Sequence, residues 1–301
     1  MSYLTKNQLI DQCTLNLLEK DWSDYFLLAG VSDAWVPYMI IALLKKTENH
    51  DIQNKRKAVF DKLHGLDKNK PIGYNRLTPN DCDSSIWYAR AINSFGLKPS
   101  KELLGYIRSH QAENGKYSTY ITTDNIHSFI AYSEKEAEEW MQPHDCVSVN
   151  GESLLLEIGM TAIGADKIAE RYKNFSPYWW ADLRIPLLMC NDKILSPILE
   201  YLNLTAINEL CSDLENSYPG YREFSRLVTY LLQIKTNPKT YFPDDLSQNL
   251  IADTKSIMQI PDPIIGYENH SDKWIYDGLV QGARVKDINS IVTSAIILSN
   301  I

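Results

Sequence analysis

The stretch GYNRLTPNDCDSSIWYARAINSFGL, residues 73–97, joins a loop rich in turn-forming residues to an apolar segment. Gly, Pro and Asn in its first half stop helices, whereas Asp and Ser are residue types preferred where a helix begins. From residue 86 to residue 95 the apolar side chains recur at helical rather than alternating spacing. The stretch therefore predicts a loop, a capped helix start and a buried helix.

The same loop-and-helix pattern returns along the chain. Clear copies occupy residues 21–44, 114–159 and 271–301, and weaker copies occupy residues 176–189 and 221–234. Such repeats bury their apolar faces by stacking on one another. Because the last copy resembles a complete repeat and not a polar cap, the six helical hairpins favour two concentric rings over an open solenoid. We therefore expect an all-α fold, an (α/α)6 barrel, in which residues 1–301 form a single domain.

Composition and charge exclude several classes of protein. The chain carries 30 Lys and Arg against 38 Asp and Glu, so its net charge of -8 repels phosphate backbones and argues against a nucleic-acid partner. Five cysteines without a CxxC pair favour free thiols in a reducing compartment and no metal site. The longest apolar stretch, residues 35–44, is about half of the roughly 20 residues that a bilayer span requires. We expect a cytoplasmic protein, with peripheral membrane contact left open.

The repeated segments resemble those of the prenyltransferase and squalene-oxidase-type superfamily, which includes squalene-hopene cyclases and class II terpene cyclases. The resemblance is carried by SDAWVPYMIIALL, GYNRLTPNDCDSSIWYARAINSFGL, HQAENGKYSTYI, HDCVSVNGESLLLEIG and INSIVTSAIILSNI, and it is weakest from about 190 to 250. It implies a helical barrel of the terpenoid cyclase type. The superfamily also contains protein prenyltransferase β subunits and proteins of no assigned activity, so the fold alone does not define the function.

Class II cyclases carry an Asp-x-Asp-Asp motif at a helix start, and its middle Asp protonates a terminal alkene or epoxide. The matching segment here is Asp81-Cys82-Asp83-Ser84. The resemblance implies that Asp83 is the proton donor, that Asp81 is an ionised partner that orients it, and that Ser84 supplies hydrogen bonds. Because an alkene is a weak base, the donor must be a neutral carboxylic acid in a dry cavity. The alternative is that these residues only cap a helix.

A carbocation can be held by aromatic faces. The candidate substrate-binding residues lie within the repeat-like segments: Trp35, Tyr74, Trp87, Tyr120, His144, Asn150, Trp179 and Trp180. Trp87 ranks first because it lies one helical turn after Asp83. His144 opens a helix where some cyclases place a group that activates the acid, and Asn150 could hydrogen-bond across the barrel. Core packing is the alternative role for each aromatic, and a helix cap is the alternative for His144.

We therefore predict a class II, protonation-initiated terpene or meroterpenoid cyclase, an isomerase or lyase, that acts on a linear isoprenoid chain. The alternative is a non-catalytic isoprenoid-binding, lipid-binding or interaction protein that retains the barrel, which Ser84 favours because it replaces the last acid of the motif. No cofactor is expected, with Mg²⁺ needed only for a diphosphate substrate. Hopene-forming relatives join two barrels whereas this chain has room for one, which leaves two alternatives: a single barrel that encloses a smaller isoprenoid, or two chains that pair as a homodimer.

Overall fold

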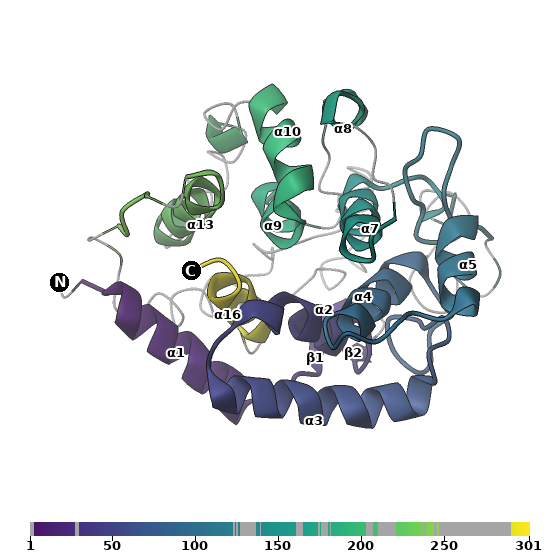
Figure 1. Ribbon diagram of the computed structural model, residues 1–301, viewed down its shortest axis with the longest axis horizontal. Helices are drawn as coiled ribbons and strands as arrows, with labels where there is room; N and C mark the ends of the chain where they lie inside the picture. Colours follow the sequence, from purple (N-terminus) through teal and green to yellow (C-terminus); the bar gives the residue numbers. More distant parts are fainter. Residues whose placement is uncertain are drawn as a thin grey trace, which may run out of the picture.

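Helices dominate the computed structural model. The described residues are 3–27, 30–122, 124, 126, 137–138, 140–160, 165–173, 175, 180, 182–202, 207–209, 221–237, 239–243, 246 and 290–301. Within these ranges the extended elements are a small antiparallel pair, β1 (Asp24–Leu27) and β2 (Gly30–Ser32), with a few isolated bridges. The expected all-α fold is confirmed, with this pair as an addition that helical periodicity could not predict (Figure 1).

An inner ring of helices forms the centre of the described structure. Its members are α2 (Trp35–Leu43), α4 (Cys82–Asn93), α7 (Asp145–Glu157), α9 (Arg184–Met189), α13 (Tyr221–Thr236) and α16 (Ile291–Leu298). From α2 to α13 each packs on the next, and α16 packs on α2 (Figure 1). Every residue of α2 is buried, as expected for a helix that is apolar all round. The contact of the last helix with the first closes the ring, as predicted for a barrel.

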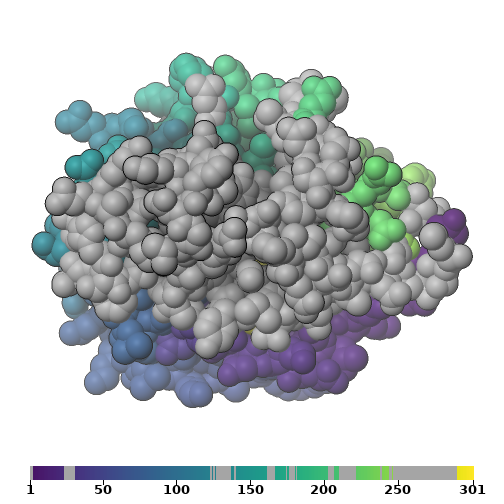
Figure 2. Space-filling view, turned by 180° about the vertical axis from the view of Figure 1, so that it is seen from behind, coloured from purple at the N-terminus to yellow at the C-terminus, as the bar shows by residue number. Residues whose placement is uncertain are grey.

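Helices of the outer layer cover this ring. They are α1 (Lys6–Glu19), α3 (His50–Asp67), α5 (Lys101–Ser109), α8 (Ala165–Arg171) and α10 (Asp192–Leu202), and a short 3-10 helix, η1 (Leu44–Lys46), follows α2. They are amphipathic: α5, for example, packs on α4 and buries Leu103 and Ile107, which lie four residues apart on one face. Helices α1 and α3 form one edge of the molecule (Figure 2). None of the described helices combines the length and apolarity needed to cross a bilayer.

The loop before α4 is tightly folded and positions the start of that helix. The side-chain oxygen of Asn75 accepts hydrogen bonds from the backbone amides of Leu77 and Thr78. Gly73 lies so close to the Thr78 and Pro79 carbonyls that an added Cβ would collide with them. The backbone amide of Asp81 then donates to the Ile72 carbonyl. Turn residues that look merely polar in the sequence therefore fix where α4 begins.

Candidate active site

Asp83 lies in the first turn of α4, where three neighbouring inner helices meet. Its side chain is buried, with 5% of the residue exposed. The indole nitrogen of Trp35, on α2, donates to Asp83 Oδ2 at 2.8 Å. The side-chain amide of Asn150, on α7, donates from Nδ2 to Asp83 Oδ1 at 3.2 Å. Both carboxyl oxygens of Asp83 are thus bound by side chains from other helices.

Asp81 plays a different structural part from Asp83. It is the N-cap of α4, and its Oδ1 accepts from the backbone amide of Ser84 at 2.7 Å. The Ser84 hydroxyl donates to Asp81 Oδ2, also at 2.7 Å. The capping role that the sequence allowed for this segment therefore belongs to Asp81, with Ser84 as its partner. Asp81 also accepts from the backbone amide of Tyr74, and the charge of Asp83 raises the pKa of Asp81.

Burial raises the pKa of both carboxyls. Desolvation raises the pKa of Asp83 to about 6, although hydrogen bonds from Trp35 and Asn150 and the charge of Arg90 act in the opposite direction. Desolvation also raises the pKa of Asp81 to about 7, against the hydrogen bonds from Ser84 and with a further rise from the charge of Asp83. A neutral carboxylic acid is thus accessible near physiological pH, because burial disfavours the ionised form.

A second layer of polar side chains holds Asn150. Its Oδ1 accepts from Arg90 Nη1 at 2.5 Å, and the same nitrogen donates to the Met189 carbonyl at 3.2 Å. Arg90 also binds both carboxylate oxygens of Glu157, at 3.2 and 2.9 Å. Sequence reasoning missed Arg90 and Glu157. Their signal is a spacing of seven residues, or two helical turns, after Asp83 on α4 and after Asn150 on α7.

Three of the predicted aromatic residues gather beside Asp83. The Trp35 ring lies 6.0 Å from the Tyr74 ring and 6.2 Å from the Trp180 ring, between centroids. All three side chains are buried. Because the Trp35 nitrogen bonds to Asp83, this aromatic group adjoins the acid through Trp35.

The remaining predicted residues contact other side chains. Tyr120 and His144 each make an edge contact with the ring of Trp140. Trp140 was not among the predicted residues. His144 Nδ1 lies 3.1 Å from Thr119 Oγ1. Trp87, one helical turn after Asp83 on α4, packs against the guanidinium of Arg90, whose carbon Cζ lies 4.6 Å from the Trp87 ring centroid. Trp179 lies outside the described residues.

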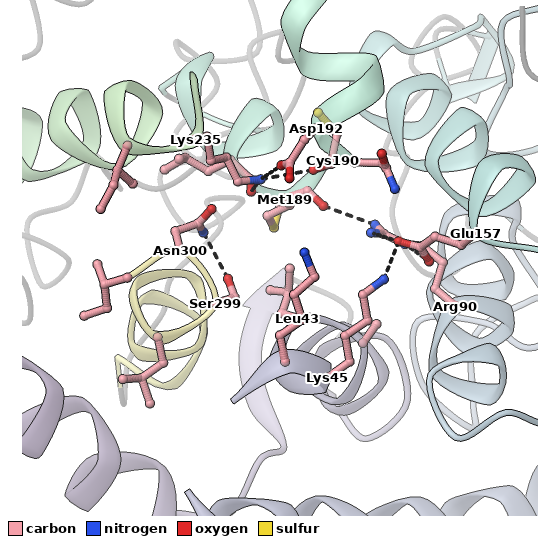
Figure 3. A pocket seen from close by; sticks show the side chains of 17 residues that line it. Leu43, Lys45, Arg90, Glu157, Met189, Cys190, Asp192, Lys235, Ser299 and Asn300 are labelled. Carbon is pink, nitrogen blue, oxygen red and sulfur yellow. Dashed lines mark hydrogen bonds and ion pairs between the residues drawn. The ribbon is translucent and has the colours of Figure 1, made fainter. Parts of the chain in front are cut away.

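A separate pocket of about 340 Å³ lies at the C-terminal ends of the inner helices (Figure 3). Residues from the ends of all six line it, so these helices run in the same direction. Lys235 donates to the carbonyls of Leu188 and Cys190 there, as expected for a cation at a helix C-terminus. Lys45 pairs with Glu157 at 2.7 Å. Charged side chains line part of this pocket, which lies at the opposite end of α4 from Asp83, so it does not supply the dry environment that a carbocation requires.

Comparison with known proteins gives likenesses of structure. No protein-family model and no curated protein matches the sequence. A protein from Actinoplanes superposes with a TM-score of 0.62 and 15% identity over 98% of both chains. The type II terpene cyclase MstE from Scytonema (apo) gives 0.64 and 16% identity over 98% of this chain and 97% of that one. An Asp-to-Asn variant of MstE in complex with geranylgeranyl dihydroxybenzoate gives 0.63 and 16% over 98% and 96%. The chain thus has a fold like that of type II terpene cyclases.

Proposed function

We propose that the chain is a class II terpene cyclase in which the neutral form of Asp83 protonates an alkene of a linear isoprenoid. One observation carries the proposal. Within the described part of the chain, both hydrogen-bond partners of the buried Asp83 are donors, the Trp35 indole and the Asn150 amide. A donor cannot accept the acid proton, so the proton of neutral Asp83 stays available to a substrate.

The proton transfer matches this arrangement. The Asp83 O–H proton goes to a terminal alkene carbon, the alkene π electrons form the new C–H bond, and the O–H electron pair stays on the carboxylate. The two N–H groups and the α4 N-terminus then stabilise that carboxylate. Hydrogen-bond donors that bind Asp83 more strongly as negative charge develops on its carboxylate stabilise the transition state more than the ground state. They therefore lower the barrier to proton transfer. The step needs no cofactor.

The aromatic group beside the acid supports the later steps. The cation left by protonation is attacked by the next double bond, and each ring closure moves the positive charge along the chain. The faces of Trp35, Tyr74 and Trp180 carry the negative quadrupole that attracts such a cation. The last cation loses a proton or is captured by water, which completes the balance. Asp81 and Ser84 fix the start of α4, the helix that carries the acid.

The likeness to MstE suggests the substrate class. Because MstE has been crystallised with geranylgeranyl dihydroxybenzoate, we propose that this chain takes a linear isoprenoid, including one joined to an aromatic head group. Farnesyl and geranylgeranyl substrates, as free alcohols, as diphosphates and as hybrids with dihydroxybenzoate, cover this class. Gas chromatography with mass spectrometry would detect cyclic products.

The decisive comparison is between two aspartate variants. Asp83→Asn should abolish cyclisation, because an amide is too weak an acid to protonate an alkene. Asp145→Asn is the matched control, since Asp145 is also buried in the first turn of an inner helix but pairs with Lys116 at 2.6 Å. It should keep its activity. Equal product from wild type and Asp83→Asn would overturn the acid assignment. No product from wild type, together with isoprenoid lipids that co-purify with it, would favour the non-catalytic binding protein.

A further inference from the structure

The orientation of the Asn150 amide is determined by Arg90. A guanidinium carries hydrogen-bond donors and no acceptor. The acceptor end of the amide must therefore face Arg90 Nη1, and this turns the donor end toward Asp83. Arg90 lies seven residues after Asp83 on α4, about 10 Å along the helix axis. Asn150 on α7 bridges the two side chains.

We propose that Arg90 is a positioning residue for the acid, which keeps the Asp83 proton deliverable by holding Asn150 in its donor orientation. The inference rests on the proposed function. If the amide turned over, its oxygen would face Asp83 and accept the acid proton in a hydrogen bond. That proton would then be held by Asn150 rather than presented to an alkene. Arg90 prevents this turn, because the turned amide would set its own N–H groups against those of the guanidinium.

Arg90 itself is held rigidly, as a positioning residue must be. Its guanidinium binds both oxygens of Glu157 and the Met189 carbonyl (Figure 3). It also stacks on Trp87. Its side chain is 4% exposed. Glu157 also pairs with Lys45, so it keeps one cation when Arg90 is replaced.

Asp83 also interacts electrostatically with other ionisable groups. Its negative charge raises the pKa of Asp81 and Cys82 of α4 and of Cys146 of α7, whereas the positive charge of Arg90 lowers the pKa of Asp83 itself. A change in titration after replacement of Arg90 would therefore combine lost charge with lost orientation. A double-variant cycle with Asn150 separates the two, because only the orientation depends on the amide.

The experiment compares Arg90→Met in two backgrounds, wild type and Asn150→Ala. In wild type, Arg90→Met should lower kcat about a hundredfold and leave KM nearly unchanged, because Arg90 does not contact the substrate. In the Asn150→Ala background no amide can turn over, so the same change should cost a few-fold at most. The matched control is Arg171→Met, which removes the arginine partner of another buried glutamate of α7, Glu152, and should leave kcat unchanged. Equal losses in the two backgrounds would overturn the inference.

A readout without substrate distinguishes failure of this inference from failure of the proposed function. Infrared spectroscopy would follow the protonated carboxyl band of Asp83, identified as the band that Asp83→Asn lacks. Arg90→Met should move its titration midpoint to higher pH by more in wild type than in the Asn150→Ala background. Equal shifts would overturn the inference even if wild type made no cyclic product. Unequal shifts together with no cyclic product from wild type would support the positioning role of Arg90 and contradict the proposed function.

A third variant covers the case in which Arg90→Met does not fold. Asn150→Asp keeps Arg90 and its ion pairs, and it replaces the donor facing Asp83 by a carboxylate oxygen. That oxygen would accept the acid proton, so kcat should fall about a hundredfold and the infrared midpoint should rise. An Asn150→Asp variant with the kcat of wild type would overturn the inference.

Discussion

Replacement of Asp83 by asparagine would set an amide between two hydrogen-bond donors. The Trp35 indole and the Asn150 amide both donate to Asp83, and an amide side chain has only one acceptor end. Asn150 cannot turn to compensate, because its oxygen accepts from Arg90. The new NH₂ group must therefore face another N–H group in a buried site.

Two opposing free-energy changes follow. An unsatisfied buried polar group costs about 1–3 kcal/mol. Against this, the rise in the pKa of Asp83 from 3.8 to about 6 corresponds to a penalty of about 3 kcal/mol on its ionised form, which the amide removes. Because the folded pKa is the higher one, the stability from this carboxyl is complete below about pH 4 and is lost as pH rises through about 6. Above about pH 7, Asp83→Asn should therefore be as stable as wild type or up to about 2 kcal/mol more stable, and near pH 4 it should be about 1–3 kcal/mol less stable.

Urea unfolding followed by circular dichroism at both pH values would measure the two differences. A second variant, Asp83→Asn combined with Asn150→Asp, tests the geometry. The NH₂ group at position 83 would then face a carboxylate at position 150 that still accepts from Arg90, so part of the lost stability should return. A stability difference between Asp83→Asn and wild type that did not vary with pH would refute the raised pKa of Asp83. If the free energy of unfolding of the double variant is no higher than the sum of the two single changes predicts, then position 83 does not lie between two hydrogen-bond donors.

Three further outcomes are expected. The cyclisation rate should fall about tenfold per pH unit above about 6, because the donor must be protonated; a rate that increases with pH would argue against an acid. Trp35→Phe keeps an aromatic ring but removes a donor to Asp83, so the midpoint of the pH–rate profile should move to higher pH, and an unmoved midpoint would contradict the bond. The helix dipole by itself favours Ser84→Asp, but Ser84 is 1% exposed and donates to Asp81. That change should therefore destabilise the fold by about 2 kcal/mol or more, and an unchanged Tm would show that the site accepts a third carboxyl.

Local and periodic features of the sequence predicted the fold. Apolar residues at helical spacing mark a helix wherever the helix later packs, so the pattern at residues 86–95 predicted α4 without knowledge of its neighbours. Asp and Ser at positions 81–85 predicted its capped start, because capping bonds form within a single turn. The repeated pattern and its complete last copy predicted ring closure, which the contact of α16 with α2 confirms.

Tertiary structure alone decided how the candidate site is arranged. The resemblance distinguished Asp83 from Asp81 by place in the motif, but only the structure shows that Asp81 caps its own helix and that Asp83 is bound by Trp35 and Asn150. Which aspartate meets Trp35 and Asn150 depends on how α2 and α7 are rotated and shifted along their axes relative to α4. Packing across the ring sets this arrangement, and the periodicity of a single segment does not record it. Arg90 was missed for the same reason. Its spacing from Asp83 is visible in the sequence, but its bond to Asn150 exists only because α7 lies beside α4 at matching height.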